Sequence, residues 1–323
     1  MLRIYIYTLI NQIMKGCEIV LKKPKLIIII ALILIIVSST LYGLAYRYLI
    51  ERDEGTVVNS FSSTSNFSDS ENDITYDDWN YTSNNFSISI EKKEDGTGDN
   101  KITYYVANVM VKDMSSFKSA FAQNRFGRNI TDTTSNIASS NNAVFAINGD
   151  YYGFREDGII IRNGTLYRDN PARDGLAFFD DGRMEIYDET STNGNALLEQ
   201  GVTNTFSFGP SLLENGKAIT NFNNVKIDSN FGNRNIDNSN PRTGIGIISP
   251  NNFVFVVVDG RDKGYSRGMT LNEFSQLFED LGCTYAYNLD GGGSSTMYFN
   301  GRVVNKPSDK DSERKVSDII YIN

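Results

Sequence analysis

The chain has 323 residues, of which 40% are hydrophobic, and its 39 acidic and 31 basic residues give a formal net charge of −8. This length and hydrophobic content allow one large domain or two small ones with a buried core. The acidic balance offers no basic stripe to neutralise phosphates, which argues against a general nucleic-acid binder. An anionic ligand would therefore be held by a local group of arginines and backbone amides.

Histidine is absent from the sequence. Its absence excludes Ser-His-Asp and Cys-His nucleophile systems and His-based zinc sites. Acid–base chemistry would then depend on Asp, Glu, Tyr or Lys. The sequence requires no cofactor, and a bound divalent cation would have mostly oxygen ligands, which favours calcium, magnesium or manganese. The metal ligands themselves stay unassigned.

The first hydrophobic segment, residues 26–45, is almost wholly apolar. Twenty residues at a rise of about 1.5 Å each cover a hydrocarbon core of roughly 30 Å. Four lysines between positions 15 and 25 precede it, so the positive-inside rule places the N-terminus in the cytoplasm and the rest outside. We predict a basic cytoplasmic leader at residues 1–25 and a single-pass signal anchor in the cell membrane at residues 26–47.

A cleaved signal peptide is the alternative interpretation of this segment. It fits less well, because the apolar run is long and no clear A-x-A site follows it. Translation could start at Met1 or at Met14. The two cysteines, Cys17 and Cys283, fall on opposite sides of the anchor, so no intrachain disulfide is expected, and Cys283 is predicted to be a buried core thiol.

Residues 48–82 are predicted to form a flexible extracellular stalk, because most of this segment is rich in Ser, Asn, Asp and Thr and lacks hydrophobic periodicity. Residues 83–323 remain as one domain. Its pattern predicts an α+β fold, a strand-rich mixed sheet with a few helices. Strands are expected at residues 86–90, 102–111, 143–147, 243–248, 252–258 and 316–322, hairpin turns at Asn163-Gly164, Asp180-Asp181-Gly182 and Asn300-Gly301, and helices at 115–126 and after the Thr270–Glu273 capping box up to Gly282.

Two segments of this domain resemble each other. Each has an apolar strand, an Asn-x-Asp sequence, a glycine-bearing loop, a second strand and an Asn-Gly turn. The Asn-x-Asp sequences are Asn148-Gly149-Asp150 and Asn288-Leu289-Asp290. If the two strand ends are neighbours in one sheet, both carboxylates and both carboxamides converge on one site; turn chemistry alone is the competing explanation.

The loop after Asp290 combines Gly291, Gly292 and Gly293 with Ser294. A loop without bulky side chains lets a ligand lie against the main chain, where successive N–H groups form an anion-binding nest. The rest of the chain is expected to position this loop or to supply side chains that face it.

Two arginines are best placed to pair with a bound phosphate. Arg242 lies beside Thr243 at the start of a strand, and Arg261 lies in a turn after the next strand. Arg314, before the last strand, is a weaker third candidate. Tyr151 belongs to a pair of aromatics that could form a sugar-stacking platform or pack under a loop.

These motifs, in order, resemble those of the phosphodiester glycosidase family over residues 141–323. The matching blocks run from Asn148-Gly149-Asp150-Tyr151-Tyr152 through Gly209-Pro210, Pro241-Arg242-Thr243-Gly244, Asp259-Gly260-Arg261, Gly268-Met269-Thr270 and Glu273 to Asn288-Leu289-Asp290-Gly291-Gly292-Gly293-Ser294-Ser295-Thr296, Asn300-Gly301, Pro307-Ser308-Asp309 and Arg314-Lys315-Val316-Ser317. Asp150 departs from the family pattern, in which glycine is common at this position.

The resemblance implies a hydrolase that cleaves sugar-1-phosphate diesters at the sugar–oxygen bond. It implies Asp290 as the catalytic carboxylate, and Arg242 and Arg261 on the phosphate. Asp150 is a further catalytic candidate from the paired Asn-x-Asp sequences, although the family pattern speaks against an essential role for it. Asn148 and Asn288 would bind sugar hydroxyls, and the glycine amides would face the anion. Thr243, Ser294 and Tyr151 complete the predicted substrate site.

Combined with the anchor, this suggests an extracellular enzyme that trims GlcNAc-1-phosphodiester-like bonds in cell-envelope or exopolysaccharide glycopolymers. The expected partners are a phosphate-containing glycan and the membrane, and not nucleic acid. A non-catalytic envelope module that only binds a glycopolymer is the alternative hypothesis. A third interpretation makes the acidic loop a structural calcium site, which is compatible with the enzyme.

Overall fold

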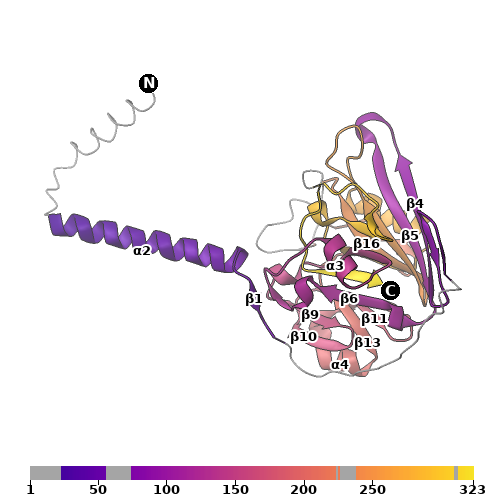
Figure 1. The fold of residues 1–323 in the computed structure, drawn as a ribbon, viewed down its shortest axis with the longest axis horizontal. Coiled ribbons are helices and arrows are strands. Elements are labelled where there is room, and N and C mark those ends of the chain that lie inside the picture. Colours follow the sequence, from indigo (N-terminus) through magenta and orange to yellow (C-terminus); the bar gives the residue numbers. More distant parts are fainter. Residues whose placement is uncertain (1–22, 56–73, 223–224, 226–237, 309–311) are drawn as a thin grey trace. The chain divides into compact units, whose positions relative to one another are not determined.

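The computed structural model of the protein describes residues 23–55, 74–222, 225, 238–308 and 312–323 (Figure 1). The chain divides into two compact units, Met1–Ile50 and Glu51–Asn323.

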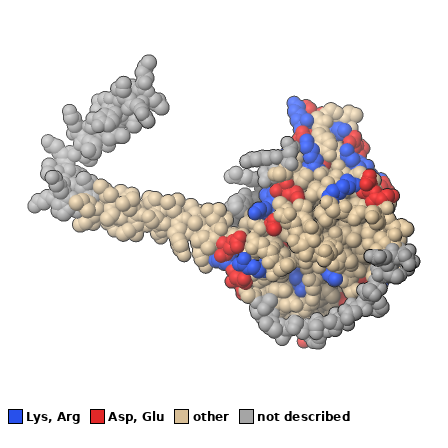
Figure 2. All heavy atoms as spheres, viewed as in Figure 1, with Lys and Arg blue, Asp and Glu red and all other residues tan. Residues whose placement is uncertain are grey.

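The first unit contains the helix α2 (Lys23–Tyr48). Its segment Ile27–Tyr48 has 22 residues and a mean hydropathy of 2.7, so it is long and apolar enough to cross a membrane, a property that signal sequences share. Figure 2 shows no charged side chains along most of its described length. The helix confirms an apolar helical segment where the anchor is predicted, whereas residues 1–22 of the predicted leader lie outside the described residues.

The second unit is built on a nine-stranded sheet. Strand β18 (Tyr285–Leu289), which leads into the glycine-rich loop, lies inside this sheet between β14 and β16. The full order is β15 (Lys217–Ala218), β14 (Ser211–Glu214), β18, β16 (Arg242–Ser249), β17 (Asn252–Val258), β5 (Ile102–Val111), β4 (Phe86–Asp95), β3 (Asn80–Thr82) and β2 (Thr75–Tyr76).

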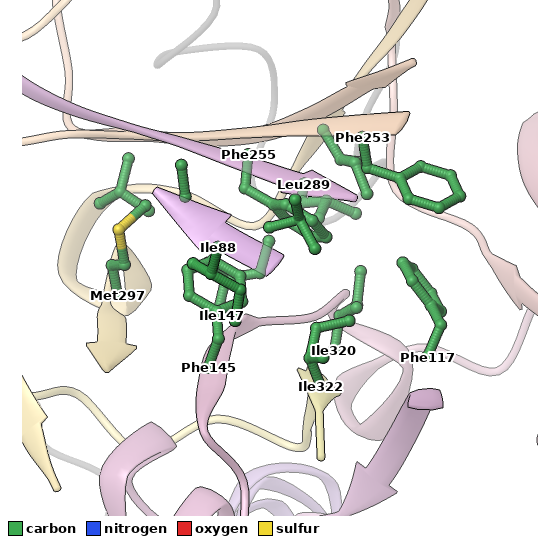
Figure 3. Packing of buried hydrophobic residues seen from close by; sticks show 14 of the residues in the cluster. Ile88, Phe117, Phe145, Ile147, Phe253, Phe255, Leu289, Met297, Ile320 and Ile322 are labelled. Atoms are coloured by element: carbon green, nitrogen blue, oxygen red, sulfur yellow. The ribbon is translucent and has the colours of Figure 1, made fainter. Parts of the chain in front are cut away.

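A five-stranded sheet packs against this one. Its order is β20 (Arg302–Val303), β19 (Met297–Phe299), β8 (Phe145–Asn148), β21 (Asp318–Ile322) and β6 (Phe117–Phe121). The main hydrophobic core lies between the two sheets, where Phe253, Phe255 and Leu289 meet Phe145 and Ile320 (Figure 3). Strand alternation produces this arrangement, because residues two apart along β8 and β17 point to the same face.

Helices cover the outer faces of both sheets. Helix α5 (Leu271–Asp280) packs on the nine-stranded sheet through Phe274 and Phe278, and α3 (Thr134–Ser140) packs on the five-stranded sheet through Ile137. Helix α4 (Gly194–Glu199) covers a smaller layer. That layer consists of a hairpin and a three-stranded sheet. The hairpin is β9 (Gly158–Arg162) and β10 (Thr165–Asn170), and the sheet has β11 (Asp174–Phe179) between β12 (Met184–Asp188) and β13 (Val202–Phe206). A separate pair is formed by β1 (Arg52–Asp53) and β7 (Gly127–Arg128).

The local signals in the sequence are confirmed where turn or cap chemistry decides the backbone. Asn163 and Gly164 have φ values of 49° and 76° between β9 and β10, as a two-residue hairpin turn requires. Thr270 and Glu273 form both halves of the capping box that starts α5, and Gly282 follows that helix with a φ of 77°. The α+β class and its strand-rich sheets are also confirmed.

Three expectations differ from the structure. The helix predicted at residues 115–126 is wrong: β6 occupies its centre and pairs with β21, which buries Phe117 and Phe121. The sheets are not mixed, since every strand pairing in the described part of the chain is antiparallel. Within the predicted stalk, residues 48–82, strand β1 pairs with β7, and β2 and β3 extend the nine-stranded sheet.

Replacing Phe255 with alanine should destabilise the second unit by about 3–5 kcal/mol, because the ring is fully buried against Phe145, with 5.0 Å between ring centroids. Urea unfolding monitored by circular dichroism measures the loss. Tyr76→Ala is the matched control, since Tyr76 is 66% exposed. Equal effects of the two substitutions would contradict the position of the core.

Candidate functional site

A cleft of about 290 Å³ lies where the loops after β8 and β18 meet the segment before β21. Its walls combine carboxylates, cations, hydroxyls and aromatic rings. The lining residues are Thr131, Asp150, Tyr151, Phe154, Asp290, Ser294, Arg314, Lys315, Val316 and Ser317.

Asp290, at the end of β18, provides the cleft with a carboxylate that is 13% exposed. Its Oδ2 accepts hydrogen bonds from Ser294 Oγ at 2.6 Å and from Arg314 Nη2 at 3.3 Å. Burial raises the pKa of Asp290, and the Arg314 charge, the Ser294 hydroxyl and the Arg155 charge oppose this rise. Asp290 is therefore a carboxylate held in a small polar cluster, with part of its surface facing the cleft.

The glycine-rich loop after Asp290 forms a short 3-10 turn, Gly292–Ser294. Gly292 has a φ of 63°, and a Cβ at this residue would lie 3.1 Å from Arg261 Nη2. The absence of a side chain therefore lets the guanidinium approach the main chain. The Gly292 amide donates to the Pro241 carbonyl at 2.9 Å, so this N–H supports the loop from behind.

Two arginines predicted to bind phosphate lie beside this loop. Arg261 has a φ of 60°, an uncommon conformation for a large residue, and both its Nε and Nη2 donate to Asn240 Oδ1. Arg242 is buried, and its Nε donates to the Met269 carbonyl.

Both guanidinium groups have a lowered pKa. Burial lowers that of Arg242 to about 10, with a further contribution from Arg261. Burial and then the charge of Arg314 lower the pKa of Arg261. Three arginines therefore repel one another around a loop with one nearby carboxylate, which makes this part of an acidic protein attractive to an anion.

The two Asn-x-Asp sequences meet, although their strands belong to different sheets. Asn148 Nδ2 donates to the Asp290 carbonyl at 2.6 Å, and the Asp290 amide donates to the Gly149 carbonyl at 3.4 Å. Asn148 Oδ1 accepts from Thr243 Oγ1 at 2.9 Å. In this arrangement Asn148 and Thr243 brace the backbone of Asp290 rather than opening into the cleft.

Asn288 also lies behind the site. It is 2% exposed, and its Nδ2 donates to the Gly209 carbonyl at 2.8 Å. Its Oδ1 is buried without a hydrogen-bond partner among the described residues. The two asparagines predicted to bind sugar hydroxyls thus face protein backbone in this structure.

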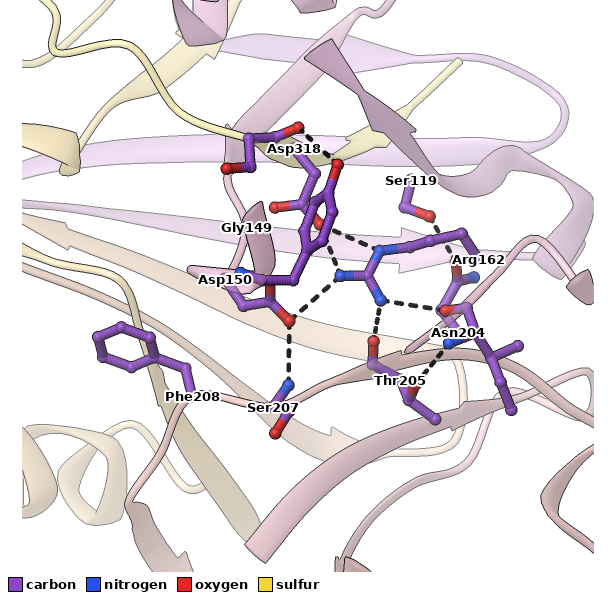
Figure 4. Close-up of polar contacts among 12 residues, drawn as sticks. Ser119, Gly149, Asp150, Arg162, Asn204, Thr205, Ser207, Phe208 and Asp318 are labelled. Carbon is purple, nitrogen blue, oxygen red and sulfur yellow. Dashed lines mark hydrogen bonds and ion pairs between the residues drawn. The ribbon is translucent and has the colours of Figure 1, made fainter. Parts of the chain in front are cut away.

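Asp150 belongs to a buried ion cluster (Figure 4). Its Oδ2 accepts from Arg162 Nη2 at 3.2 Å and from the Ser207 amide at 3.0 Å, and its side chain has no exposed surface. The same Nη2 donates to Asp318 Oδ2 at 2.6 Å. Asp150 therefore lies behind the cleft wall, with its carboxylate used inside the protein.

Two carboxylates share one guanidinium in this cluster, so ionising both leaves a net negative charge in the interior. Burial raises the pKa of Asp318 to about 7, although Arg162 opposes the rise. Gly149 allows this packing, because a Cβ there would lie 2.3 Å from Asp318 Oδ1.

The aromatic wall is formed by Tyr151 and Phe154. Their rings stack with centroids 4.7 Å apart, and Arg155 lies over Tyr151 at 5.4 Å. Tyr152, the other half of the predicted aromatic pair, is 1% exposed and packs on Phe126 in the core. Tyr151 is therefore the member of the pair that can face a sugar, and Phe154 replaces Tyr152 as its neighbour.

Arg314 is closer to the centre of the site than its sequence context indicates, and the sequence gives little sign of the role of Arg162. Arg314 is the cation that pairs with Asp290, and Arg162 holds Asp150 and Asp318. The Arg314-Lys315-Val316-Ser317 block was a usable signal for the first. The second is the last residue of an apolar strand, a position that signals a buried charge only weakly. Among the described residues, no group of three or more His, Cys, Asp or Glu side chains could hold a metal ion.

Comparison with known proteins agrees with this fold. Residues 141–323 match the phosphodiester glycosidase family. The chain belongs to that family. It is 32% identical over 261 residues to the SPbeta prophage-derived uncharacterized protein YomE of Bacillus subtilis, covering 74% of this chain and 38% of YomE. It is 31% identical over 97 residues to bovine N-acetylglucosamine-1-phosphodiester alpha-N-acetylglucosaminidase, covering 28% of this chain and 18% of the bovine protein.

The fold is similar to two solved structures. The zebrafish N-acetylglucosamine-1-phosphodiester alpha-N-acetylglucosaminidase catalytic domain, auto-inhibited by its pro-peptide, aligns with a TM-score of 0.58 and 21% identity over 75% of this chain and 84% of that chain. A hypothetical protein from Synechocystis aligns with a TM-score of 0.57 and 15% identity over 74% of this chain and 62% of that chain. At these identities the likeness concerns the fold. The chain spans less than two fifths of each curated relative.

The Asp318 pKa gives the folding stability a pH dependence with a definite sign. The pKa rises from 3.8 in the unfolded chain to about 7 in the folded one, so the folded state binds the proton more tightly. This group's contribution to the free energy of unfolding should therefore fall as the pH rises from about 4 to 7. Urea unfolding across this range should show a smaller fall for Asp318→Asn than for the wild type; a larger fall would contradict the raised pKa.

Proposed function

We propose that the protein is a hydrolase that cleaves sugar-1-phosphate diesters at the bond between the anomeric carbon and the phosphate oxygen. The observation that carries the proposal is the Asp290 carboxylate, partly open to the cleft and paired with Arg314, next to a glycine loop approached by Arg261. Membership of the phosphodiester glycosidase family supports the same chemistry.

In this proposal the phosphate lies over the Gly291–Gly293 loop. Arg261, next to Gly292, and Arg314, next to Gly291, stabilise its charge, and Arg242 adds positive potential. The sugar ring lies against Tyr151, since aromatic faces pack on the apolar face of a sugar. The leaving group is a phosphomonoester, which departs without strong general-acid help.

Asp290 acts at the anomeric carbon. Either it takes a proton from the attacking water, or it attacks the carbon directly and water then releases the sugar. In both routes the carbon–oxygen bond breaks, its electron pair goes to the phosphate oxygen, and water supplies the new hydroxyl of the sugar. Asp150, with no exposed side-chain surface, supports the loop that carries Tyr151 instead of contacting the substrate.

We further propose that the enzyme is anchored in the cell membrane by α2, with its second unit outside the cell. The apolar segment Ile27–Tyr48 and the lysines that precede it support this topology. A phosphate-containing glycopolymer of the envelope or an exopolysaccharide, with GlcNAc-1-phosphodiester-like bonds, is then the accessible substrate class.

Asp290→Asn should abolish sugar release, because the amide can neither accept the proton nor attack the anomeric carbon. Residual activity of about one part in 10³ or less is expected. The full chain in detergent micelles would be incubated with a GlcNAc-1-phosphodiester and related diesters, with free sugar measured by chromatography. Asp99→Asn is the control, because Asp99 is an exposed aspartate outside the cleft lining.

Sugar release by the wild type distinguishes a catalytic protein from one that only binds a glycopolymer. A folded wild type that releases no sugar from any of these diesters would contradict the proposal. Saturable glycopolymer binding without turnover would instead support the binding module. Full activity in Asp290→Asn would move the catalytic role to another residue.

Arg261→Lys should raise the KM for the diester about 10-fold, because a lysine keeps the charge but loses the planar fork that faces the loop. Steady-state kinetics measures this. Arg183→Lys serves as the control, since Arg183 pairs with exposed Asp181 in the turn between β11 and β12, whereas Arg261 lies against Gly292 of the glycine loop. An unchanged KM would remove Arg261 from the phosphate site.

A further inference from the structure

The segment that carries Arg314 is held at both ends by the same neighbouring stretch of chain. After Arg314, the amide of Val316 donates to the Asp132 carbonyl at 2.7 Å, and the Asp132 amide donates back at 3.0 Å. Before Arg314, Glu313 Oε1 accepts from the Ser135 amide at 2.9 Å, and Glu313 Oε2 accepts from the Ser135 hydroxyl. The two residues between these ties, Arg314 and Lys315, both line the cleft.

Arg314 needs such support because its contacts with the site are many and its side chain is long. Its Nη2 donates to Asp290 Oδ2 at 3.3 Å, to the Gly291 carbonyl at 3.1 Å and to Ser294 Oγ at 2.6 Å. The Arg314 side chain is nevertheless 43% exposed. Burial alone therefore does not fix its position, and holding one rotamer of such a side chain carries an entropic cost.

The Glu313 contact is stronger than an ordinary surface hydrogen bond. A carboxylate that accepts from both a backbone amide and a hydroxyl of one residue is fixed in orientation, and charge-assisted bonds are roughly twice as strong as neutral ones. Ser135 lies in the first turn of α3, whose Ile137 and Ala138 are buried against the five-stranded sheet. Glu313 thus ties the Arg314 backbone to a helix anchored in a hydrophobic core.

We propose that Glu313 is a positioning residue, which through Ser135 fixes the segment so that Arg314 is held on Asp290. It touches neither substrate nor reacting atoms. This inference deepens the proposed function and rests on it for its kinetic consequences, but the contact between Arg314 and Asp290 can be followed without any turnover.

The position of Arg314 affects the pKa of Asp290, because the Arg314 charge favours the ionised carboxylate. Arg314 and Arg155 are the cations that favour its ionised form, with the Ser294 hydroxyl and the Gly291 amide. The other residues with titratable side chains that line the cleft are Tyr151, Lys315 and Asp150, and the Asp150 carboxylate has no exposed surface. If Arg314 moves away, the burial of Asp290 is less opposed and its carboxyl binds a proton more tightly.

A double-mutant cycle tests the proposal directly. The four proteins are the wild type, Glu313→Ala, Arg314→Gln and the double variant, each as the full chain in detergent micelles. Carbon-13 NMR of labelled aspartate carboxyls follows the titration of Asp290, with Asp290→Asn identifying its signal. Each single substitution should raise the Asp290 pKa, and the double variant should match Arg314→Gln alone, because Glu313 acts through Arg314.

Two further variants guard against a simple loss of structure. Glu313→Gln keeps an oxygen for the Ser135 amide and should largely restore the wild-type titration, and Ser135→Ala should shift it in the same direction as Glu313→Ala but less. Glu199→Ala, an exposed glutamate on α4, should leave the titration unchanged. If Glu313→Ala does not fold, as judged by its melting curve, Ser135→Ala and Glu313→Gln carry the test.

Steady-state kinetics provides a second readout, measured on a diester that the wild type cleaves. Glu313→Ala should lower kcat/KM about 10- to 100-fold in the wild-type background and have little effect in the Arg314→Gln background. Additive effects in the cycle, or an Asp290 titration unaffected by Glu313→Ala, would overturn the inference. If no diester is cleaved by the wild type, the proposed function fails, whereas the NMR cycle still decides the role of Glu313.

Discussion

The architecture of the site depends on one buried guanidinium shared by two carboxylates. Arg162, at the end of β9, holds Asp150 in the loop after β8 and Asp318 at the start of β21. Both segments supply residues that line the cleft, Tyr151 on one and Ser317 on the other. Removing Arg162 would leave two buried carboxylates without a counter-charge, which is far costlier than losing a surface ion pair.

The buried cluster and the glycine loop carry opposite excess charges. Behind the cleft wall, two carboxylates and Arg162 leave excess negative charge that burial partly suppresses. Around the glycine loop, Arg242, Arg261 and Arg314 outnumber Asp290, and their mutual repulsion is relieved when an anion binds. Elsewhere, on the face shown in Figure 2, acidic and basic groups are interspersed.

The sequence predicted those features that short-range chemistry decides. Asn163-Gly164 and the Thr270–Glu273 capping box require particular backbone angles or local hydrogen bonds, and both are found. The helix expected at residues 115–126 failed because Phe117 and Phe121 fit a helical period as well as a buried strand, and pairing with β21 decides between them. The burial of Asp150 could not be predicted, since it depends on Arg162 and on a strand at the other end of the domain.

The most direct test is to determine which bond of the diester is broken. Hydrolysis of a sugar-1-phosphodiester in water enriched in oxygen-18, followed by mass spectrometry of the products, distinguishes the two sides of the bridging oxygen. Attack at the anomeric carbon, as proposed for Asp290 and its cleft, predicts a phosphomonoester without the label. Oxygen-18 in the phosphomonoester would show attack at phosphorus and would contradict the assignment of the site as a glycosidase.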